Sequence, residues 1–409
     1  MSTILSPGDV KLRDGRSVDF ANLDVAATAP CLRVVADAVA ELLPFYGSVH
    51  RGAGALSERC TREYEQARET VADFLGCRDG DTVVFTRNTT DALNLLARAL
   101  PADTTVLTFD AEHHANLLPW RRTVHLDAPR SPQEAVTALE RALSRQHCGL
   151  VSVTAASNVT GEVWPVAALA EVAHRYGARI AVDAAQLAPH APVDLTALGA
   201  DYVAFSGHKV YAPFGAGVLA GRADWLDAAA PYLAGGGASA NVDGDLGVRW
   251  ATGPARHEAG TPNLLGAVAI ASACRALSDA GDAAQEQALV SRLRAGLAGL
   301  PHVEELRLFG PDAERVGIVS FAVLGEDPGD LATRLGRDHG IGVRTGLFCA
   351  HPLTRRLLEE ATARLDPAAP VPAQAVRASF GLGTTEEHID RLLAALRRQD
   401  VQAPGVQAS

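Results

Sequence analysis

The sequence predicts an α/β protein whose main domain contains a mostly parallel, doubly wound sheet. Between residues 80 and 220, short apolar and β-branched runs alternate with stretches of helical periodicity, a pattern typical of βαβ units. Polar or charged residues follow directly after these runs, at the edge of the sheet where α/β proteins bind ligands. Near residue 280 this pattern ends, and strands and helices alternate again in the last third of the chain. We therefore expect a second, smaller C-terminal α/β domain.

The expected organisation is a lead-in over residues 1–20, a large domain over 21–280, a small domain over 281–400 and a tail over 401–409, a division that 409 residues permit. The formal net charge is −11 and no run of Lys and Arg resembles a nucleic-acid patch, so no such partner is expected. The N-terminus lacks a signal-peptide pattern and no apolar run reaches membrane-spanning length, which predicts a cytoplasmic protein without a membrane partner. The 6 cysteines are scattered without a CxxC pair, which favours reduced thiols and no metal site.

The first strand of the large domain, residues 82–86, leads into a hydroxyl-rich turn, Asn88–Thr90, and then a helix. Free N–H groups and the positive end of the helix dipole make such a turn suitable for an anion. Thr and Asp are also common N-caps, so a plain cap explains the same residues. A later strand, 150–154, is followed by a turn over 157–161 that contains an asparagine.

Two further strand ends carry ionisable side chains. The strand 105–109 is followed by His113 and His114; adjacent histidines seldom share a metal, so an imidazole stacked on a cofactor ring is the better hypothesis. The strand 179–182 ends at Asp183. A carboxylate there is costly without a cationic partner, and both a helix N-cap and a partner for a protonated ring nitrogen would explain it.

The strand 202–205 and the turn after it lead to Lys209. The chain has two lysines, Lys11 and Lys209, and its other basic side chains are arginine or histidine. An amine can lose its proton and attack a carbonyl group, whereas a guanidinium cannot. Because its neighbours at adjacent strand ends are also polar, we interpret Lys209 as a functional amine and not as a surface lysine.

The C-terminal part adds two candidate residues. Cys349 lies on a short loop after a strand, and Arg377 lies within the strand 376–380, where it needs an anion. The Gly-rich stretch 235–256 is expected to be a long loop, and a capping box over 384–387 is expected to start the last helix.

An amine, a carboxylate, an imidazole and an anion cradle at neighbouring strand ends match one cofactor, pyridoxal 5'-phosphate (PLP). Lys209 would form the Schiff base, and Asp183 would keep the pyridine nitrogen protonated so that the ring acts as an electron sink. His113 would stack on the ring, and Arg377 would hold the α-carboxylate of a substrate with its fork of N–H groups. The phosphate would be bound by Asn88, Thr89, Thr90, Ser206 and His208.

The chain resembles the class V aminotransferase superfamily of fold-type I PLP enzymes, and within it the SufS-like (group II) cysteine desulfurases. The resemblance runs from about Asn22 to Leu396. The segments that carry it are VHRG (49–52), TRNTTDALNLLA (86–97), EHHANLLPW (112–120), SNVTGEVWP (157–165), VDAAQ (182–186), FSGHKVYAPFGAGVL (205–219), EAGTPN (258–263), RTGLFCAHPL (344–353) and VRASF (376–380). It implies a large domain with a seven-stranded sheet.

The resemblance also implies individual roles. Lys209 carries PLP, Asp183 and Gln186 bind its ring nitrogen and phenolate oxygen, and His113 stacks on the ring. Cys349 receives the sulfur as a persulfide. The implied phosphate ligands are Thr90, Ser206, His208 and, from a partner subunit, Thr261, with Asn88, Thr89 and Asn158 beside the cofactor. The implied substrate-binding residues are Arg377, Arg344, Asn158 and, across a homodimer with shared active sites, His50 and Arg51.

The implied reaction converts L-cysteine into L-alanine and a Cys349 persulfide, which a sulfur-acceptor protein would receive. In place of the two histidines of the family motif RTGHHCA, this chain has Leu347 and Phe348. That apolar wall motivates an alternative, a desulfurase-derived PLP enzyme acting on another amino acid by C–S cleavage, decarboxylation, deamination, transamination or epimerisation. A non-catalytic scaffold that has kept the fold is a third hypothesis.

Overall fold

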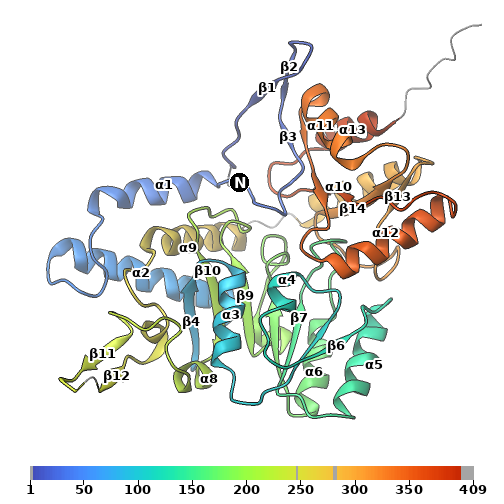
Figure 1. Cartoon of the computed structure of the whole chain (residues 1–409). Coiled ribbons are helices and arrows are strands. Elements are labelled where there is room, and N and C mark those ends of the chain that lie inside the picture. The colour runs from blue at the N-terminus through green and yellow to red at the C-terminus, as the bar shows by residue number, and fades with distance from the viewer. Residues whose placement is uncertain (1–2, 246, 280–282, 398–409) are drawn as a thin grey trace, which may run out of the picture.

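The computed structural model describes residues 3–245, 247–279 and 283–397, with a seven-stranded sheet at its centre (Figure 1). In spatial order the strands are β4 (Asp81–Thr86), β10 (Gly217–Arg222), β9 (Tyr202–Ser206), β8 (Arg179–Asp183), β7 (Leu150–Thr154), β5 (Val106–Phe109) and β6 (Thr123–Leu126). β10 pairs antiparallel with both neighbours, and the strands from β9 to β6 pair in parallel. The predicted α/β class with a mostly parallel sheet is confirmed.

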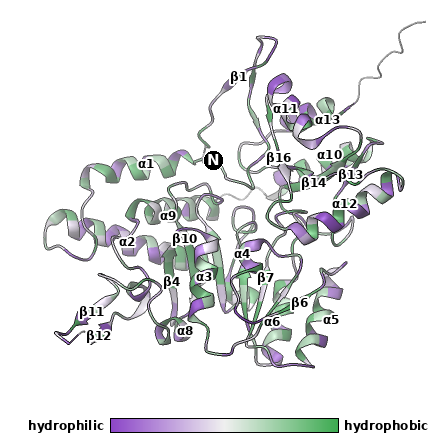
Figure 2. Ribbon diagram, in the orientation of Figure 1, coloured by the Kyte–Doolittle hydropathy of each residue, from purple (hydrophilic) through white to green (hydrophobic). Residues whose placement is uncertain are grey.

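Helices cover both faces of this sheet because successive strand residues point to opposite sides. In β9, Val203 and Phe205 pack into one core, whereas Tyr202 and Ala204 pack into the other. The apolar strands at the centre stand out in Figure 2. On the first side lie α1 (Arg33–Leu42), α2 (Ala55–Phe74), α5 (Pro132–Leu143), α6 (Val166–Arg175), α7 (Leu195–Leu198) and α9 (Leu264–Ser278). On the second side lie α3 (Thr89–Ala99), α4 (His114–Leu117) and α8 (Ala223–Ala228).

The C-terminal unit is built on a smaller antiparallel sheet in the order β13 (Val303–Glu305), β14 (Ile318–Val323), β17 (Ala375–Ser379) and β16 (Arg344–Gly346). Its helices are α10 (Ala283–Ala298), α11 (Pro328–His339), α12 (His351–Leu365) and α13 (Glu386–Leu396). The side chains of α10, α11 and α13 form a second core with one face of this sheet. The other face and α12 pack against the large core, so the two units share an extended boundary.

The N-terminal segment joins the C-terminal unit. β3 (Ala21–Asn22) pairs in parallel with β15 (Ile341–Gly342), and Ala21 and Leu23 are buried in the second core. Before it, β1 (Asp9–Lys11) and β2 (Ser17–Asp19) form a hairpin that projects beside α11 (Figure 1). Within the described part of the expected lead-in, β1 and β2 pair with each other, and the Arg13 N–H donates to the Arg337 carbonyl at 2.8 Å.

Two local expectations are wrong. The stretch expected as a long loop contains a hairpin of β11 (Ser239–Val242) and β12 (Val248–Trp250), followed by the 3-10 turn η2 (Gly253–Arg256). The last capping box is formed by Thr385 and His388, because Thr384 Oγ1 instead accepts a hydrogen bond from the Gly381 N–H (3.3 Å). A second 3-10 turn, η1 (Leu43–Phe45), follows α1. The expected tail over 401–409 lies outside the described residues.

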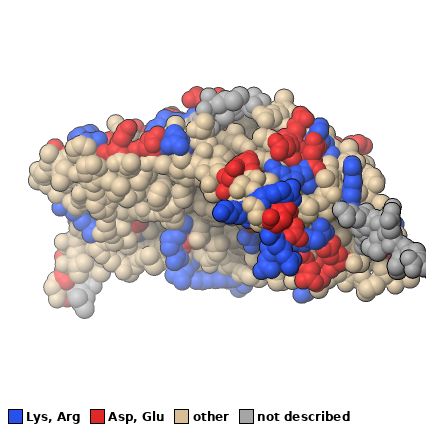
Figure 3. All heavy atoms as spheres, turned by 90° about the horizontal axis from the view of Figure 1, so that it is seen from above, with Lys and Arg blue, Asp and Glu red and all other residues tan. Residues whose placement is uncertain are grey.

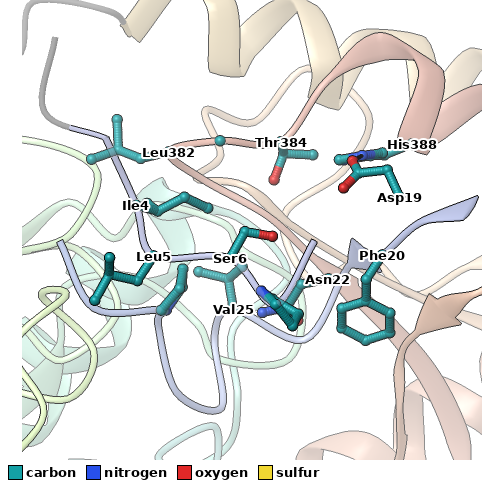
Figure 4. Close-up of a pocket in the computed structure, with 13 residues that line it drawn as sticks. Ile4, Leu5, Ser6, Asp19, Phe20, Asn22, Val25, Leu382, Thr384 and His388 are labelled. Carbon is teal, nitrogen blue, oxygen red and sulfur yellow. Dashed lines mark hydrogen bonds and ion pairs between the residues drawn. The ribbon is translucent and has the colours of Figure 1, made fainter. Parts of the chain in front are cut away.

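The surface gives few further clues to function. Within the described ranges no helix combines the length and apolar character needed to cross a membrane. Seen from above, acidic and basic side chains are interspersed over the C-terminal unit (Figure 3), where Arg292, for example, pairs with Asp390. A cavity of about 230 Å³ lies between the N-terminal segment and the start of α13, and Asp19 Oδ2 lies 2.9 Å from His388 Nε2 at its wall (Figure 4).

Candidate active site

Lys209 lies in the turn after β9, partly buried among charged side chains. Burial lowers the pKa of its amine from 10.5 to about 8, and repulsion from Arg377 acts in the same direction. Attraction to Asp183 and to Cys349 opposes this shift. The lysine therefore lies within electrostatic reach of a carboxylate, a thiol and a guanidinium, and about a tenth of it is a free amine at pH 7.

Asp183 is the last residue of β8 and is 4% exposed. One carboxylate oxygen accepts the backbone N–H of Ala185 at 3.0 Å. Burial raises the pKa of this carboxyl, while the Lys209 amine counteracts the shift. Gln186, one turn further, donates from Nε2 to the Ala26 carbonyl at 3.0 Å, and its buried Oε1 has no hydrogen-bond partner among the described residues. Asp183 and Gln186 thus both reach this edge of the sheet, and each can accept a further hydrogen bond.

His113 caps the short helix α4 with its own side chain. Its Nδ1 accepts the backbone N–H of Ala115 at 3.0 Å. The hydrogen of the neutral ring is then on Nε2. Burial, with repulsion from Lys209 and other nearby cations, lowers the pKa of His113 to about 3. The side chain is therefore a neutral imidazole, held by one nitrogen, beside the amine.

The hydroxyl-rich turn meets the lysine turn at the ends of β4 and β9. Ser206 Oγ accepts the Thr89 N–H at 2.8 Å and lies 2.6 Å from Thr89 Oγ1. Asn88 caps α3 by accepting the Asp91 N–H, so the plain N-cap explanation holds for this side chain. Thr90 is exposed at the same helix N-terminus and its hydroxyl has no hydrogen bond within the described part of the chain. Of the three predicted turn residues, Thr90 is the one whose side chain is free for an anion.

A glycine and a histidine shape this corner. A Cβ on Gly217 would lie 2.5 Å from the Cα of Asn88, so glycine lets β10 pass close beneath the turn. His208 Nδ1 lies 3.2 Å from Thr28 Oγ1, and its backbone carbonyl accepts the Ala29 N–H at 2.8 Å. The segment after β3 is thereby fixed beside Lys209.

Arg377 projects from β17 and is 3% exposed. Its Nη1 donates to the Asn158 carbonyl at 2.9 Å and its Nη2 to Asp24 at a long 3.4 Å, while Nε is buried without a partner in the described ranges. Burial lowers the pKa of the guanidinium to about 10, which leaves it charged at neutral pH. Arg344, directly opposite on β16, is more exposed and donates from Nε to both Asp24 oxygens at 3.1 and 3.2 Å. One aspartate thus pairs with two facing arginines, which leaves one positive charge uncompensated within this group.

Cys349 is exposed on the loop between β16 and α12. Its carbonyl accepts the His114 N–H at 2.7 Å, and the preceding carbonyl, of Phe348, accepts Asn158 Nδ2 at 2.7 Å. The thiol influences the pKa of both Lys209 and Arg377, so it lies near both. The loop therefore brings the predicted sulfur carrier to the lysine group.

Three predicted residues lie elsewhere in this chain. His50 Nε2 lies 2.8 Å from Glu65, and Arg51 donates to the Gly260 carbonyl at 2.9 Å. Both line a surface hollow of about 430 Å³ together with Gly260 and Pro262, which flank the exposed Thr261. Within the described part of one chain, none of the hydrogen bonds of His50, Arg51 and Thr261 reaches Lys209 or the side chains around it.

Two acidic side chains of the site, Asp24 and Glu112, were not predicted from the sequence. Asp24 could not be placed beside Arg377 because they are 353 positions apart. Glu112 is fully buried; it accepts Asn116 Nδ2 at 2.8 Å and the Thr154 N–H at 3.0 Å, and burial raises its pKa to about 8, with Asp183 adding to the shift. A carboxylate just after an apolar strand was the signal that singled out Asp183, and the same signal applies to Glu112. Across the described residues, no group of three or more His, Cys, Asp or Glu could hold a metal ion.

The family model described as aminotransferase class-V matches residues 21–392, nearly the whole chain. The chain belongs to the class-V aminotransferase family. A cysteine desulfurase of Klebsiella pneumoniae (strain 342) is 37% identical over 406 residues, covering 94% of this chain and 95% of that protein. This class-V aminotransferase family member is also similar to two solved structures. They are an apo cysteine desulfurase from Thermococcus onnurineus NA1 (34% identity, TM-score 0.81) and the cysteine desulfurase CsdA from Escherichia coli (32% identity, TM-score 0.79). Each covers 92% of this chain and is itself covered to 94%, and together they confirm the expected fold-type I architecture.

Proposed function

We propose that this chain is a PLP-dependent cysteine desulfurase that moves the sulfur of L-cysteine onto Cys349 and releases L-alanine. The observation that carries the proposal is the meeting of three groups from separate segments. The Cys349 thiol lies within electrostatic reach of both the Lys209 amine and the Arg377 guanidinium. An amine, a carboxylate-binding fork and a thiol are the three groups that this reaction requires of the protein.

The residues present fit PLP. Gln186 Oε1 is buried and has no hydrogen-bond partner in the described part of the chain, and the exposed Thr90 hydroxyl stands at a helix N-terminus that suits a phosphate. Lys209 would hold the cofactor covalently, Asp183 would face its ring nitrogen and His113 its ring, with Ser206, His208 and Thr90 near the phosphate. When bound, PLP supplies an electron sink for the α-carbon of an amino acid.

The protein's own groups would act as follows. The Nε–Nη2 edge of Arg377 would receive the α-carboxylate in a charge-assisted pair. Lys209, with a pKa of about 8, keeps enough free amine near neutral pH to accept the α-proton. The Cys349 thiolate would then attack the substrate sulfur: an S–S bond forms, the C–S bond breaks, and its electron pair stays with the carbon. Protonation of that carbon, together with return of a proton to the α-carbon, gives L-alanine, and a sulfur-acceptor protein would take the persulfide sulfur from the exposed loop.

A homodimer would complete the site. His50, Arg51 and Thr261 lie at or beside a surface hollow, away from the lysine group of their own chain. Apolar side chains at Leu43, Phe45, Tyr46 and Leu56 are exposed next to it, as expected where a second copy packs. We therefore propose that these three residues act in the partner's site. We also propose a cytoplasmic location, where the six free thiols would stay reduced.

One observation favours a second candidate. Leu347 and Phe348 place an apolar wall beside Cys349, and Phe348 is 8% exposed. Such a wall would also fit a family member that acts on another amino acid and does not use the thiol.

Alanine release separates the two candidates. The PLP-loaded protein and its Cys349→Ala variant are incubated with L-cysteine, and free L-alanine is quantified. We expect alanine from the wild type and none from the variant. Equal release from both would contradict sulfur transfer to Cys349, and no release from either would contradict the desulfurase proposal and favour the second candidate.

A further inference from the structure

The ring of Phe348 covers the guanidinium of Arg377. Arg377 Cζ lies 4.9 Å from the ring centroid, within the range of a cation–π contact. Both side chains are buried, at 8% and 3% exposure. Because little water reaches the pair, the attraction is stronger than at an exposed site.

Three residues from distant segments form a closed cycle around this contact. Arg377 Nη1 donates to the Asn158 carbonyl, Asn158 Nδ2 donates to the Phe348 carbonyl, and the Phe348 ring returns to Arg377. The cycle occupies one nitrogen of the guanidinium and one of its faces. The Nε–Nη2 edge, with an unpaired Nε and a 3.4 Å contact to Asp24, is the edge left for a ligand.

The backbone conformation of the Cys349 loop is held by contacts with neighbouring segments. Phe348 and Cys349 have φ of 51° and 53°, in the left-handed region that side chains rarely adopt. Two successive residues of this kind persist only where the surroundings fix them. Here the fixing contacts are the Asn158 amide, the His114 N–H and the Thr354 hydroxyl, which donates to the Leu347 carbonyl at 3.2 Å.

We propose that Phe348 is a positioning residue for the substrate carboxylate: its ring fixes the plane of the Arg377 guanidinium and ties that plane to the loop carrying Cys349. The inference rests on the proposed function in that it takes an α-amino acid as the ligand. Phe348 touches neither the substrate nor the reacting atoms in this role; it acts through Arg377.

The test compares two ligands that differ by one carboxylate. L-alanine and ethylamine are titrated into the PLP-loaded protein, and the visible absorbance of the cofactor gives each Kd. Phe348→Leu keeps an apolar side chain without a π face, so the Kd for L-alanine should rise about 3- to 10-fold, while that for ethylamine stays unchanged. Phe348→Met is a second ring-free variant, and Phe348→Tyr, which keeps the ring, should restore the wild-type Kd.

Two controls separate positioning from loss of structure. Phe20→Leu makes the same substitution at a ring beside the cavity of Figure 4, outside the candidate site, and should leave both Kd values unchanged. In turnover, Phe348→Leu should raise KM for L-cysteine while kcat stays near the wild-type value. An unchanged Kd for L-alanine in both ring-free variants, or equal losses for the two ligands, would overturn the inference. A wild type that binds L-alanine more tightly than ethylamine yet releases no alanine from L-cysteine would contradict the proposed function and leave this inference standing.

Discussion

The lysine end and the cysteine end of the candidate site are held in different ways. Around Lys209, the side chains follow strands of one sheet, and partners such as Ser206 and Thr89 come from neighbouring strand ends. Around Cys349, the loop belongs to the C-terminal unit, and its anchors, Asn158 and His114, come from the large unit. The first arrangement follows from sheet topology, whereas the second exists only when the two units are packed together.

This difference has a chemical consequence. The strand ends are rigid and pre-organised, which suits groups that hold a cofactor in one orientation. The Cys349 thiol is exposed and sits on a left-handed turn, which suits a group that receives sulfur inside the site and delivers it outside. The following changes test each end separately.

The largest effect is expected at the lysine end. Lys209→Ala removes the amine that binds the cofactor and accepts the α-proton, so alanine release should fall about 10³-fold or more. Lys11→Ala, which removes the other, exposed lysine, is the matched control and should leave turnover unchanged. Steady-state alanine formation and the visible cofactor absorbance measure both variants. Wild-type turnover in Lys209→Ala would remove the basis of the account.

A smaller effect is expected where the two ends meet. Arg377→Lys keeps a charge but loses the planar fork in a buried position, so KM for L-cysteine should rise about 100-fold. Arg344→Lys changes the exposed arginine on the facing strand, where a surface pair with Asp24 contributes little, and KM should change less than about 5-fold. Michaelis kinetics of the pair decide the point: equal effects at both positions would show that burial does not select the carboxylate-binding arginine.

A pH dependence follows from the amine at the lysine end. Only the free amine of Lys209 can bond to the cofactor aldehyde, and burial lowers its pKa from 10.5 to about 8. The rate of PLP uptake by the cofactor-free protein should therefore rise about tenfold per pH unit up to the pKa and level off above it. Stopped-flow absorbance between about pH 6 and 10 gives the midpoint. A midpoint at the ordinary lysine value would show that the amine is not buried in solution.

The last effect concerns stability. Because the folded-state pKa of Glu112 is about 8, above its ordinary 4.5, the folded protein binds more protons than the unfolded chain between these values. This contribution to stability is fully present below about pH 4.5 and is lost as pH rises towards 8, at about 1 kcal/mol per pH unit. Glu112→Gln should flatten this slope in urea unfolding, because the amide does not titrate. The amide can also keep both hydrogen bonds if the Asn116 side-chain amide turns over. Glu69→Gln, at an exposed carboxylate, should leave the slope as in the wild type.

The sequence was informative where local chemistry decides structure. The alternation of apolar runs predicted the sheet, and polar residues after those runs predicted the strand ends that carry Lys209, Asp183 and His113. It was uninformative where partners come from far along the chain, as with Asp24 beside Arg377 and the Asn158 amide on the Cys349 loop. From the sequence, Phe348 could be interpreted only as part of an apolar wall, because no sequence pattern shows that its ring lies over a guanidinium.

The most direct measurement is the mass of the peptide that contains Cys349 after one turnover. The PLP-loaded protein is mixed with a stoichiometric amount of L-cysteine, quenched with an alkylating reagent and digested under non-reducing conditions. We expect one additional sulfur atom on Cys349, in an amount equal to the L-alanine released, and none in Lys209→Ala. Alanine formed without sulfur on Cys349 would contradict the claim that the lysine and cysteine ends form one desulfurase site.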